Sequence, residues 1–212
     1  MPSVTTALPS LSEQAARLIE LDVHRIAGLS ADRLRNLPER ADSLLVVHPD
    51  LASPSALTPL LRVNDKPGFV VADMADVDEF TLISSVTLPD APLYLVHDLD
   101  RGDAMANCRP DEALPAIADA GRTPLTLTEG LHWLLQRPDV LARGRCFMTI
   151  ASRRLKSSGS LDARTPAVWI SNGTGRDGPA NRNAPKVGWC WAGNRHNWLG
   201  FASASGRKPL GA

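Results

Sequence analysis

The stretch that decides the fold is the last third of the chain, and its centre reads VGWCWAGNRHNWLGFAS at residues 187–203. It contains four short apolar runs, at residues 146–151 (CFMTIA), 167–171 (AVWIS), 187–191 and 198–203. Each run is bounded by Gly, Pro, Asn or Ser, which is typical of β-strands. Because no long helical run lies between them, we expect antiparallel pairing.

The earlier part of the chain alternates between helical and strand patterns. Helices are expected at residues 11–26, where Ser10 and Glu13 have capping-box spacing, and at 31–37, 110–120 and 126–137. Strands are expected at 44–47, 61–63, 69–71 and 93–97. This order predicts an α+β fold with N-terminal helices, a mixed or antiparallel central sheet and an antiparallel four-strand C-terminal region. Residues 1–9 are expected to form a flexible leader and 10–212 a single domain, with a subdivision near 104–128 as the alternative.

Composition and charge limit the function classes. Lys plus Arg and Asp plus Glu both number 23 in 212 residues, and this zero net charge argues against a nucleic-acid binder. Three widely spaced cysteines form no disulfide framework, so we expect a reducing cytoplasm. No signal peptide or bilayer-spanning apolar run is evident, so no membrane association is expected. Without metal-ligand spacing among Cys and His, we expect neither a bound metal nor a cofactor.

A carboxylate-rich turn, HDLDRGD at residues 97–103, follows the clearest strand of the middle section. Clustered carboxylates at a strand end suit acid/base chemistry, so Asp98 and Asp103 are candidate catalytic residues and Arg101 a candidate for binding substrate. The alternative is a charged turn in which Arg101 pairs with a carboxylate and the aspartates cap local amides.

Cys190 and His196 lie on either side of a Gly193-Asn194 turn, so they are candidates for a thiol nucleophile and its base. A buried, unreactive cysteine between two tryptophans is the alternative.

Tryptophan is unusually frequent in the C-terminal region. Period-two alternation places Trp189 and Trp191 on one strand face, where the two rings would form a wall for a flat or cationic ligand. Core packing is the alternative for each single tryptophan. Taken with the turn, this pattern predicts a ligand site between residues 98–103 and the hairpin 189–198. The expected binding residues there are Trp189, Trp191, Trp198, Asn194 and Arg145.

Two polar loops complete the candidates. GTGRDG at residues 173–178 matches G-x-G-x-x-G, but the following PANRNAP has no helical pattern, so we expect an inter-strand loop and no dinucleotide site. Since this loop looks poor in apolar residues, it is expected to be dispensable for folding. Residues 153–165 and 172–185 are locally basic and suit an anionic ligand or partner.

Several motifs in this sequence resemble a family of actinobacterial proteins of unknown function. They are LYLV at 93–96, DRGD at 100–103, GRTPLT at 121–126, RCFM at 145–148, GWCWAGN at 188–194 and HNWLG at 196–200. The resemblance covers most of the chain and implies an actinobacterial source. It carries no reaction, and the loop at 172–185 looks longer than the family's.

Two functions therefore remain. The first is a small-molecule-binding protein or a metal-independent enzyme with a pocket beside the C-terminal strands. The second is an interaction protein that contacts a macromolecule through loops 153–165 and 172–185. Burial of the tryptophans around a concave cavity would favour the first function.

Overall fold

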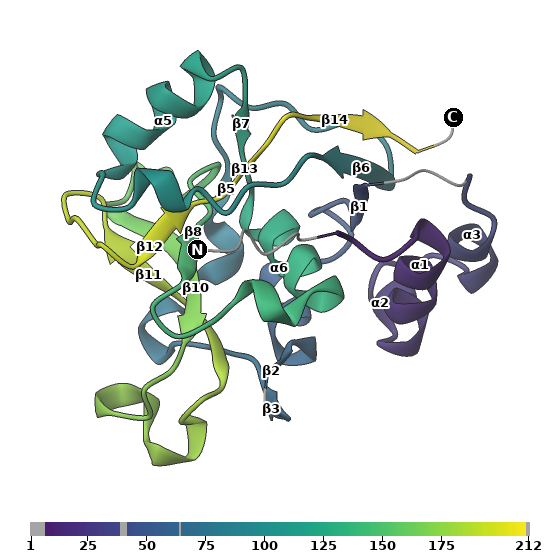
Figure 1. Ribbon diagram of the computed structural model, residues 1–212, viewed down its shortest axis with the longest axis horizontal. Helices are drawn as coiled ribbons and strands as arrows, with labels where there is room; N and C mark the ends of the chain where they lie inside the picture. The colour runs from purple at the N-terminus through teal and green to yellow at the C-terminus, as the bar shows by residue number, and fades with distance from the viewer. Residues whose placement is uncertain (1–6, 39–41, 64, 211–212) are drawn as a thin grey trace.

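The computed structural model describes residues 7–38, 42–63 and 65–210 (Figure 1). Its α-helices are α1 (Leu11–Glu20), α2 (Val23–Ile26), α3 (Ala31–Arg35), α4 (Pro54–Leu57), α5 (Pro110–Asp119) and α6 (Leu127–Gln136). Its strands are β1 (Ser43–Val47), β2 (Arg62–Val63), β3 (Lys66–Pro67), β4 (Phe69–Val70), β5 (Thr81–Leu82), β6 (Leu93–His97), β7 (Thr123–Pro124), β8 (Cys146–Met148), β9 (Ser152–Arg153), β10 (Arg164–Ile170), β11 (Pro185–Trp191), β12 (Leu199–Phe201), β13 (Ser203–Ala204) and β14 (Gly206–Pro209). The chain has an α+β fold.

The predicted C-terminal strands all form and lie in one mixed sheet of order β12-β8-β10-β11-β4. The expectation of wholly antiparallel pairing is wrong. β10 is antiparallel to β8 and β11, but β12 runs parallel to β8 and β4 runs parallel to β11. Because β10 and β4 occupy both edges of β11, no edge is left there for a hairpin with β12. Residues 192–198 instead carry the chain to the far edge of the sheet.

A second sheet joins segments that are far apart in sequence. β6 lies between β1 and β14, and both pairings are antiparallel. β1 is buried along its whole length, as are Leu93 to Val96 of β6. Such continuous burial explains why both strands are unbroken apolar runs in the sequence.

Helix α6 packs between the two main sheets, in the middle of the molecule in Figure 1. All ten of its residues are buried. Trp133 packs on Phe147 of β8 with ring centroids 5.7 Å apart, and on another face the Nε2 atom of His132 accepts from the amide of Val47 in β1 at 3.2 Å. The capping box of Thr126 and Glu129 sets the start of this helix.

The N-terminal helices cover one side of the three-stranded sheet. The Ser10–Glu13 capping box forms as predicted, but the single helix expected over residues 11–26 is divided into α1 and α2. The break lies at Asp22, whose φ of 57° is left-handed, a conformation that aspartate tolerates better than most residues. Of the predicted leader, residues 1–6 lie outside the described residues. Within the described ranges, no helix is long and apolar enough to cross a membrane.

Candidate functional site

The candidate site is built on the pairing of β10 with β11, which places Trp169 opposite Lys186. The ammonium group of Lys186 lies 4.6 Å from the centroid of the Trp169 ring, close enough for a cation–π contact. Gly188 makes room for that ring, because a Cβ atom there would lie 2.6 Å from Cη2 of Trp169. Because Gly188 has no side chain, the Trp169 ring fits against its backbone. This contact joins β10 and β11, which are neighbours in the same sheet.

Lys186 also forms an ion pair with Asp177, which lies in the loop between the two strands. The Nζ–Oδ2 distance is 2.6 Å, and the side chains of Lys186 and Asp177 are only 11% and 10% exposed. The same Oδ2 atom accepts from the hydroxyl of Ser171 at 2.7 Å. Burial strengthens charge-assisted bonds, so this pair fixes the loop onto the sheet.

The loop folds back over the sheet as two short 3-10 turns, Gly175–Asp177 and Pro179–Asn181. Gly173 adopts a left-handed φ of 69° and lies directly against Arg182, where a Cβ atom would come within 2.5 Å of the Arg182 side chain. No long helix follows the G-x-G-x-x-G motif, so the prediction of an inter-strand loop is confirmed. Ala184 is buried, and Arg143 donates to both Asn172 and Asn183. These contacts argue against the prediction that the loop is dispensable for folding.

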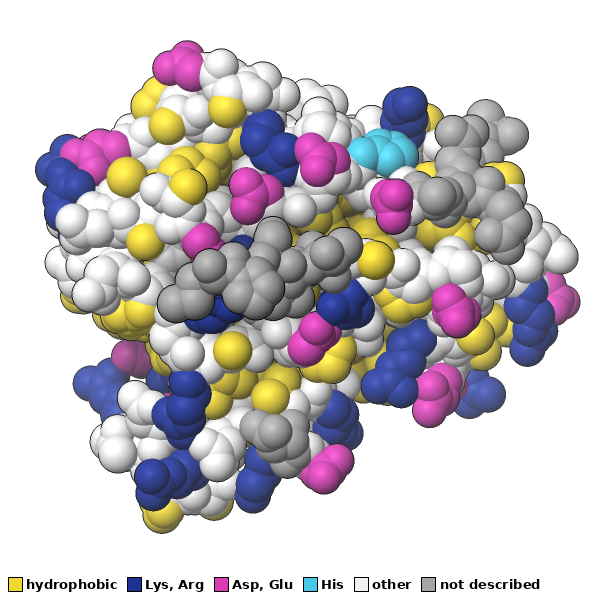
Figure 2. Space-filling view, viewed as in Figure 1, with side chains coloured by type: hydrophobic (Ala, Val, Ile, Leu, Met, Phe, Trp, Pro, Cys, Tyr) yellow, Lys and Arg dark blue, Asp and Glu magenta, His cyan; other side chains and the backbone are white. Residues whose placement is uncertain are grey.

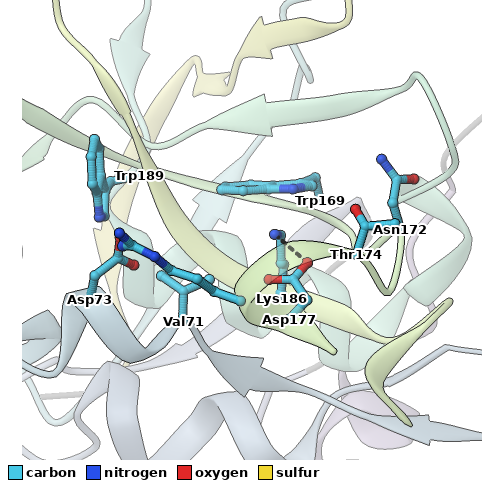
Figure 3. A pocket seen from close by; sticks show the side chains of 9 residues that line it. Val71, Asp73, Trp169, Asn172, Thr174, Asp177, Lys186 and Trp189 are labelled. Carbon is cyan, nitrogen blue, oxygen red and sulfur yellow. Dashed lines mark hydrogen bonds and ion pairs between the residues drawn. The ribbon is translucent and has the colours of Figure 1, made fainter. Parts of the chain in front are cut away.

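Loop and sheet together form a pocket of about 300 Å³ that is open to solvent (Figure 3). Two regions distant in sequence line it, and their residues are Val71 and Asp73 from the first region and Trp169, Asn172, Thr174, Arg176, Asp177, Lys186 and Trp189 from the second. Arg176 reaches across to Asp73, with Nη1 and Oδ2 2.5 Å apart. Two indole rings, two cations and two carboxylates thus converge on one pocket, which is more polar than most small-molecule sites.

Several polar atoms at this pocket have no partner among the described residues. Asp177 uses Oδ2 for both of its side-chain bonds, which leaves Oδ1 as a free acceptor. Asn172 accepts from Arg143 through Oδ1 at 2.6 Å, and because a guanidinium only donates, Nδ2 is left as a donor. No side-chain bond of Thr174 occurs within the described ranges, so its hydroxyl is available as well.

Of the residues predicted to bind a ligand, Trp189 lines this pocket. Trp191 lies on the same strand face, as expected, with its ring 4.5 Å from that of Trp189, but it is half exposed and outside the pocket. Trp198 contacts Trp169 with ring centroids 6.2 Å apart, so it supports the pocket wall without lining it. Asn194 and Arg145 are exposed residues outside the lining.

Cys190 is buried next to the pocket wall, and burial raises the pKa of its thiol to about 12. Burial also lowers the pKa of His196, whose ring packs on Trp198 at 5.2 Å. A thiol with so high a pKa is protonated at neutral pH, so this geometry favours the unreactive alternative for Cys190. The Cys190–His196 hairpin is absent because β12 does not pair with β11.

The turn at residues 97–103 does meet the segment around β12, but through its backbone. Asp100 forms a β-bridge with Ser203, and a Cβ atom on Gly200 would lie 2.3 Å from the carbonyl oxygen of Arg101. The carboxylates are already occupied, since Asp103 pairs with Arg101 at 2.5 Å and Asp98 with Arg122 at 2.6 Å. Asp100 accepts from the amide of Gly102. This matches the charged-turn alternative, and none of the three aspartates lines the Trp169–Trp189 pocket.

The sequence interpretation missed most residues of the pocket. Trp169 lies in the expected strand 167–171, and Asn172, Thr174 and Asp177 lie in the polar loop 172–185. Lys186 falls between this loop and the next expected strand. A usable signal is present, since two neighbouring strands each carry a tryptophan and are joined by a long loop rich in Gly, Asn and Arg. Across the described ranges, no group of three His, Cys, Asp or Glu residues is arranged to hold a metal ion.

Comparison with known proteins identifies the family. The model of a family of unknown function, DUF5701, matches residues 17–210. The chain belongs to this family. No curated protein and no solved structure matches it. The DUF5701 match includes both main sheets and every residue that lines the pocket, so the candidate site lies within the family's domain.

Proposed function

We propose that this DUF5701 protein binds a small molecule in the Trp169–Trp189 pocket. The observation that carries the proposal is the set of unpartnered polar atoms on Asn172, Thr174 and Asp177 beside two indole rings. Asn172 and Thr174 are exposed, so their free atoms can be reached by a ligand, and convergent polar groups beside aromatic rings give a ligand its orientation. Both carboxylates of the pocket are in ion pairs, so the geometry supports binding and assigns no reaction.

We also propose that the protein comes from an actinobacterium and is located in the cytoplasm. The source is supported by the sequence motifs at residues 93–103 and 188–200. The compartment is supported by the three cysteines, which are all free thiols.

A thermal-shift screen against neutral, anionic and cationic metabolites tests the proposal. A ligand that binds only the folded state raises the melting temperature by mass action. The hits are then measured against Trp189→Ala, which removes one wall of the pocket, and against Trp191→Phe, which changes the neighbouring exposed ring. We expect the shift to disappear in the first variant and to persist in the second. If no metabolite shifts the melting temperature, or if Trp189→Ala leaves every shift intact, the proposed function is wrong.

One observation favours the second function, contact with a macromolecule. Leu155 and Leu161 face each other across a β-bridge and are 64% and 47% exposed, and Trp191 nearby is 50% exposed. The surface of loop 153–165 carries less positive charge than its arginines suggest, because Arg154 and Arg164 form ion pairs with Asp76 and Asp162. Figure 2 shows Lys and Arg side chains on the lower-left lobe, where Figure 1 places the β10–β11 loop. Sedimentation velocity of the wild type and of Leu155→Ser tests self-association through this surface, and a monomer at every concentration would exclude a second copy as the partner.

A further inference from the structure

The chemistry of the free atoms at the Trp169–Trp189 pocket narrows the class of ligand. Asn172 Nδ2 is a donor, Asp177 Oδ1 is an acceptor, and the Thr174 hydroxyl is both. Arg176 uses only Nη1 in its bond to Asp73, so its other N–H groups face no partner among the described residues. A ligand that matches this mixed set must both donate and accept at several points, as neighbouring hydroxyl groups do.

The charge balance of the pocket favours an uncharged ligand. Its two cations, Lys186 and Arg176, are each held by one of its two carboxylates, Asp177 and Asp73. At the nearly buried pair itself, an anion would compete with Asp177 for a lysine that is only 11% exposed, and a cation would compete with that lysine for Asp177 Oδ2. The free N–H groups of Arg176 belong to a side chain that is 76% exposed, where screening by water weakens the attraction of an anion. Breaking a nearly buried pair leaves an uncompensated charge, which is unfavourable. A neutral ligand requires no such exchange.

The aromatic walls suit a single saturated ring better than a planar base. One face of Trp169 is already covered by the ammonium group of Lys186. In Figure 3 the rings of Trp169 and Trp189 stand on separate walls and are not stacked as a parallel pair. A planar base is therefore not sandwiched between two indoles here. The C–H groups of a sugar ring carry a small positive charge and pack well on an electron-rich indole face. Trp189 lines the pocket, and no cation of the described residues lies over its ring as Lys186 lies over Trp169.

We propose that the pocket binds a neutral saccharide of one or two rings. Its hydroxyl groups bond to Asn172 Nδ2, the Thr174 hydroxyl and Asp177 Oδ1, and a C–H face of the ring packs on Trp189. The cavity of about 300 Å³ is at the lower end of the range for small-molecule sites, which agrees with a ligand of this size. This inference rests on the proposed function and names the ligand class of the same site.

Saturation-transfer NMR on the intact chain tests the ligand class. The probes are neutral saccharides (glucose, galactose, mannose, N-acetylglucosamine, maltose and trehalose), two nucleosides (adenosine and uridine) and two anions (inorganic phosphate and citrate). We expect signal transfer to at least one saccharide, strongest at the C–H protons of one ring face. Titration then gives the dissociation constant.

Two surface substitutions assign the contacts without disturbing the core, since Asn172 and Thr174 are both exposed. Thr174→Val removes a hydroxyl at nearly constant shape, and Asn172→Asp keeps the acceptor for Arg143 while replacing the free donor by an acceptor. Loss of one hydrogen bond predicts a dissociation constant raised about fivefold in each variant. Trp189→Ala is expected to raise it tenfold or more, and Trp191→Phe and Leu155→Ser are controls that leave it unchanged.

The outcomes separate the two proposals. If adenosine, uridine, phosphate or citrate binds and is weakened by these variants while no saccharide binds, the ligand class is wrong and the pocket function stands. If a saccharide binds all three pocket variants with the same dissociation constant as the wild type, the assignment to this pocket is wrong. If no saccharide binds at its highest soluble concentration, the inference fails, whatever the wider metabolite screen finds. If the thermal-shift screen also finds no ligand, the proposed function is wrong too.

Discussion

Two ion pairs, Arg207–Glu129 and Lys186–Asp177, are almost equally buried yet differ in how their bonding capacity is used. Glu129 accepts four bonds, two from Arg207 and one each from the Tyr94 hydroxyl and the Thr126 amide. Arg207 uses four of its five N–H groups, on Glu129, Thr123 and Pro124. Burial and the neighbouring Glu129 raise the pKa of Tyr94 well above its usual value, so this hydroxyl is a neutral donor.

Lys186 and Asp177 differ from that closed cluster in one respect. Their pair lies at the wall of a cavity, and Asp177 Oδ1 and its neighbours keep unused bonding capacity. The closed cluster joins β14, β6 and the start of α6, and its two charged side chains are almost fully buried. Burial of charge alone therefore does not mark a functional site in this protein. The proposed site differs from the closed cluster by combining access with unsatisfied donors and acceptors.

The largest expected effect is that of breaking the closed cluster. Arg207→Met leaves Glu129 buried without its charged partner, and such a loss destabilises a protein by about 3–5 kcal/mol. Urea unfolding measures it. The matched control is Arg195→Met, which breaks an exposed pair with Glu112 and is expected to destabilise the protein far less, because water screens that pair. Equal effects of the two substitutions would remove the distinction between closed and exposed pairs.

The next effect concerns pH and the same central helix. His132 Nε2 accepts from the Val47 amide, so Nδ1 carries the proton and donates to Thr128. Burial lowers the pKa of His132 from 6.5 to about 4. Since the unfolded chain takes up this proton first, the stabilisation is complete above pH 6.5 and is lost as the pH falls from 6.5 towards 4.

That loss is expected to reach about 2–3 kcal/mol, from the size of the shift. The measurement is the free energy of unfolding as a function of pH. His132→Gln should flatten the slope in this window, whereas His48→Gln, which changes a histidine outside the helix, should keep it. A wild-type free energy that is constant between pH 6.5 and 4 would show that His132 is not held neutral.

A smaller effect tests how the pocket wall is built. Gly188→Ala places a methyl group against the Trp169 ring and Val71, and overpacking of this kind costs about 1–3 kcal/mol. It also displaces Trp169, so ligand binding should weaken and the near-ultraviolet circular dichroism should change. Gly193→Ala is the control, because nothing lies within 4 Å of the Cβ position at Gly193. If both variants behave like the wild type, Trp169 does not rest on Gly188.

The smallest effect belongs to the exposed pair at the pocket mouth. Arg176 is 76% exposed, so Arg176→Gln is expected to change the free energy of unfolding by less than about 1 kcal/mol. The difference from wild type should vanish at high salt, because exposed charges are screened. A double-mutant cycle with Asp73→Asn isolates the pair. A coupling energy as large as that of Arg207 with Glu129 would show that this exposed pair stabilises the fold as strongly as the buried one.

The sequence by itself determined the local elements of this protein. The capping boxes at Ser10 and Thr126 and the apolar strand Leu93–His97 follow from hydrogen bonds and periodicity within a few residues. Trp189 could be predicted as a pocket-lining residue because a tryptophan on one face of a short strand is a local pattern. The left-handed break at Asp22 could not, since nothing in the helical pattern of residues 11–26 required it.

Only the tertiary structure decided which strands are neighbours and where the pocket lies. β12 pairs with β8 because both edges of β11 are occupied, and that occupancy depends on β4, more than a hundred residues earlier in the chain. The pocket likewise needs Lys186 opposite Trp169, Asp177 folded back onto Lys186, and Asp73 brought to Arg176. Such contacts arise from the packing of the whole chain, because the free energy that selects them comes from burial and pairing between distant segments.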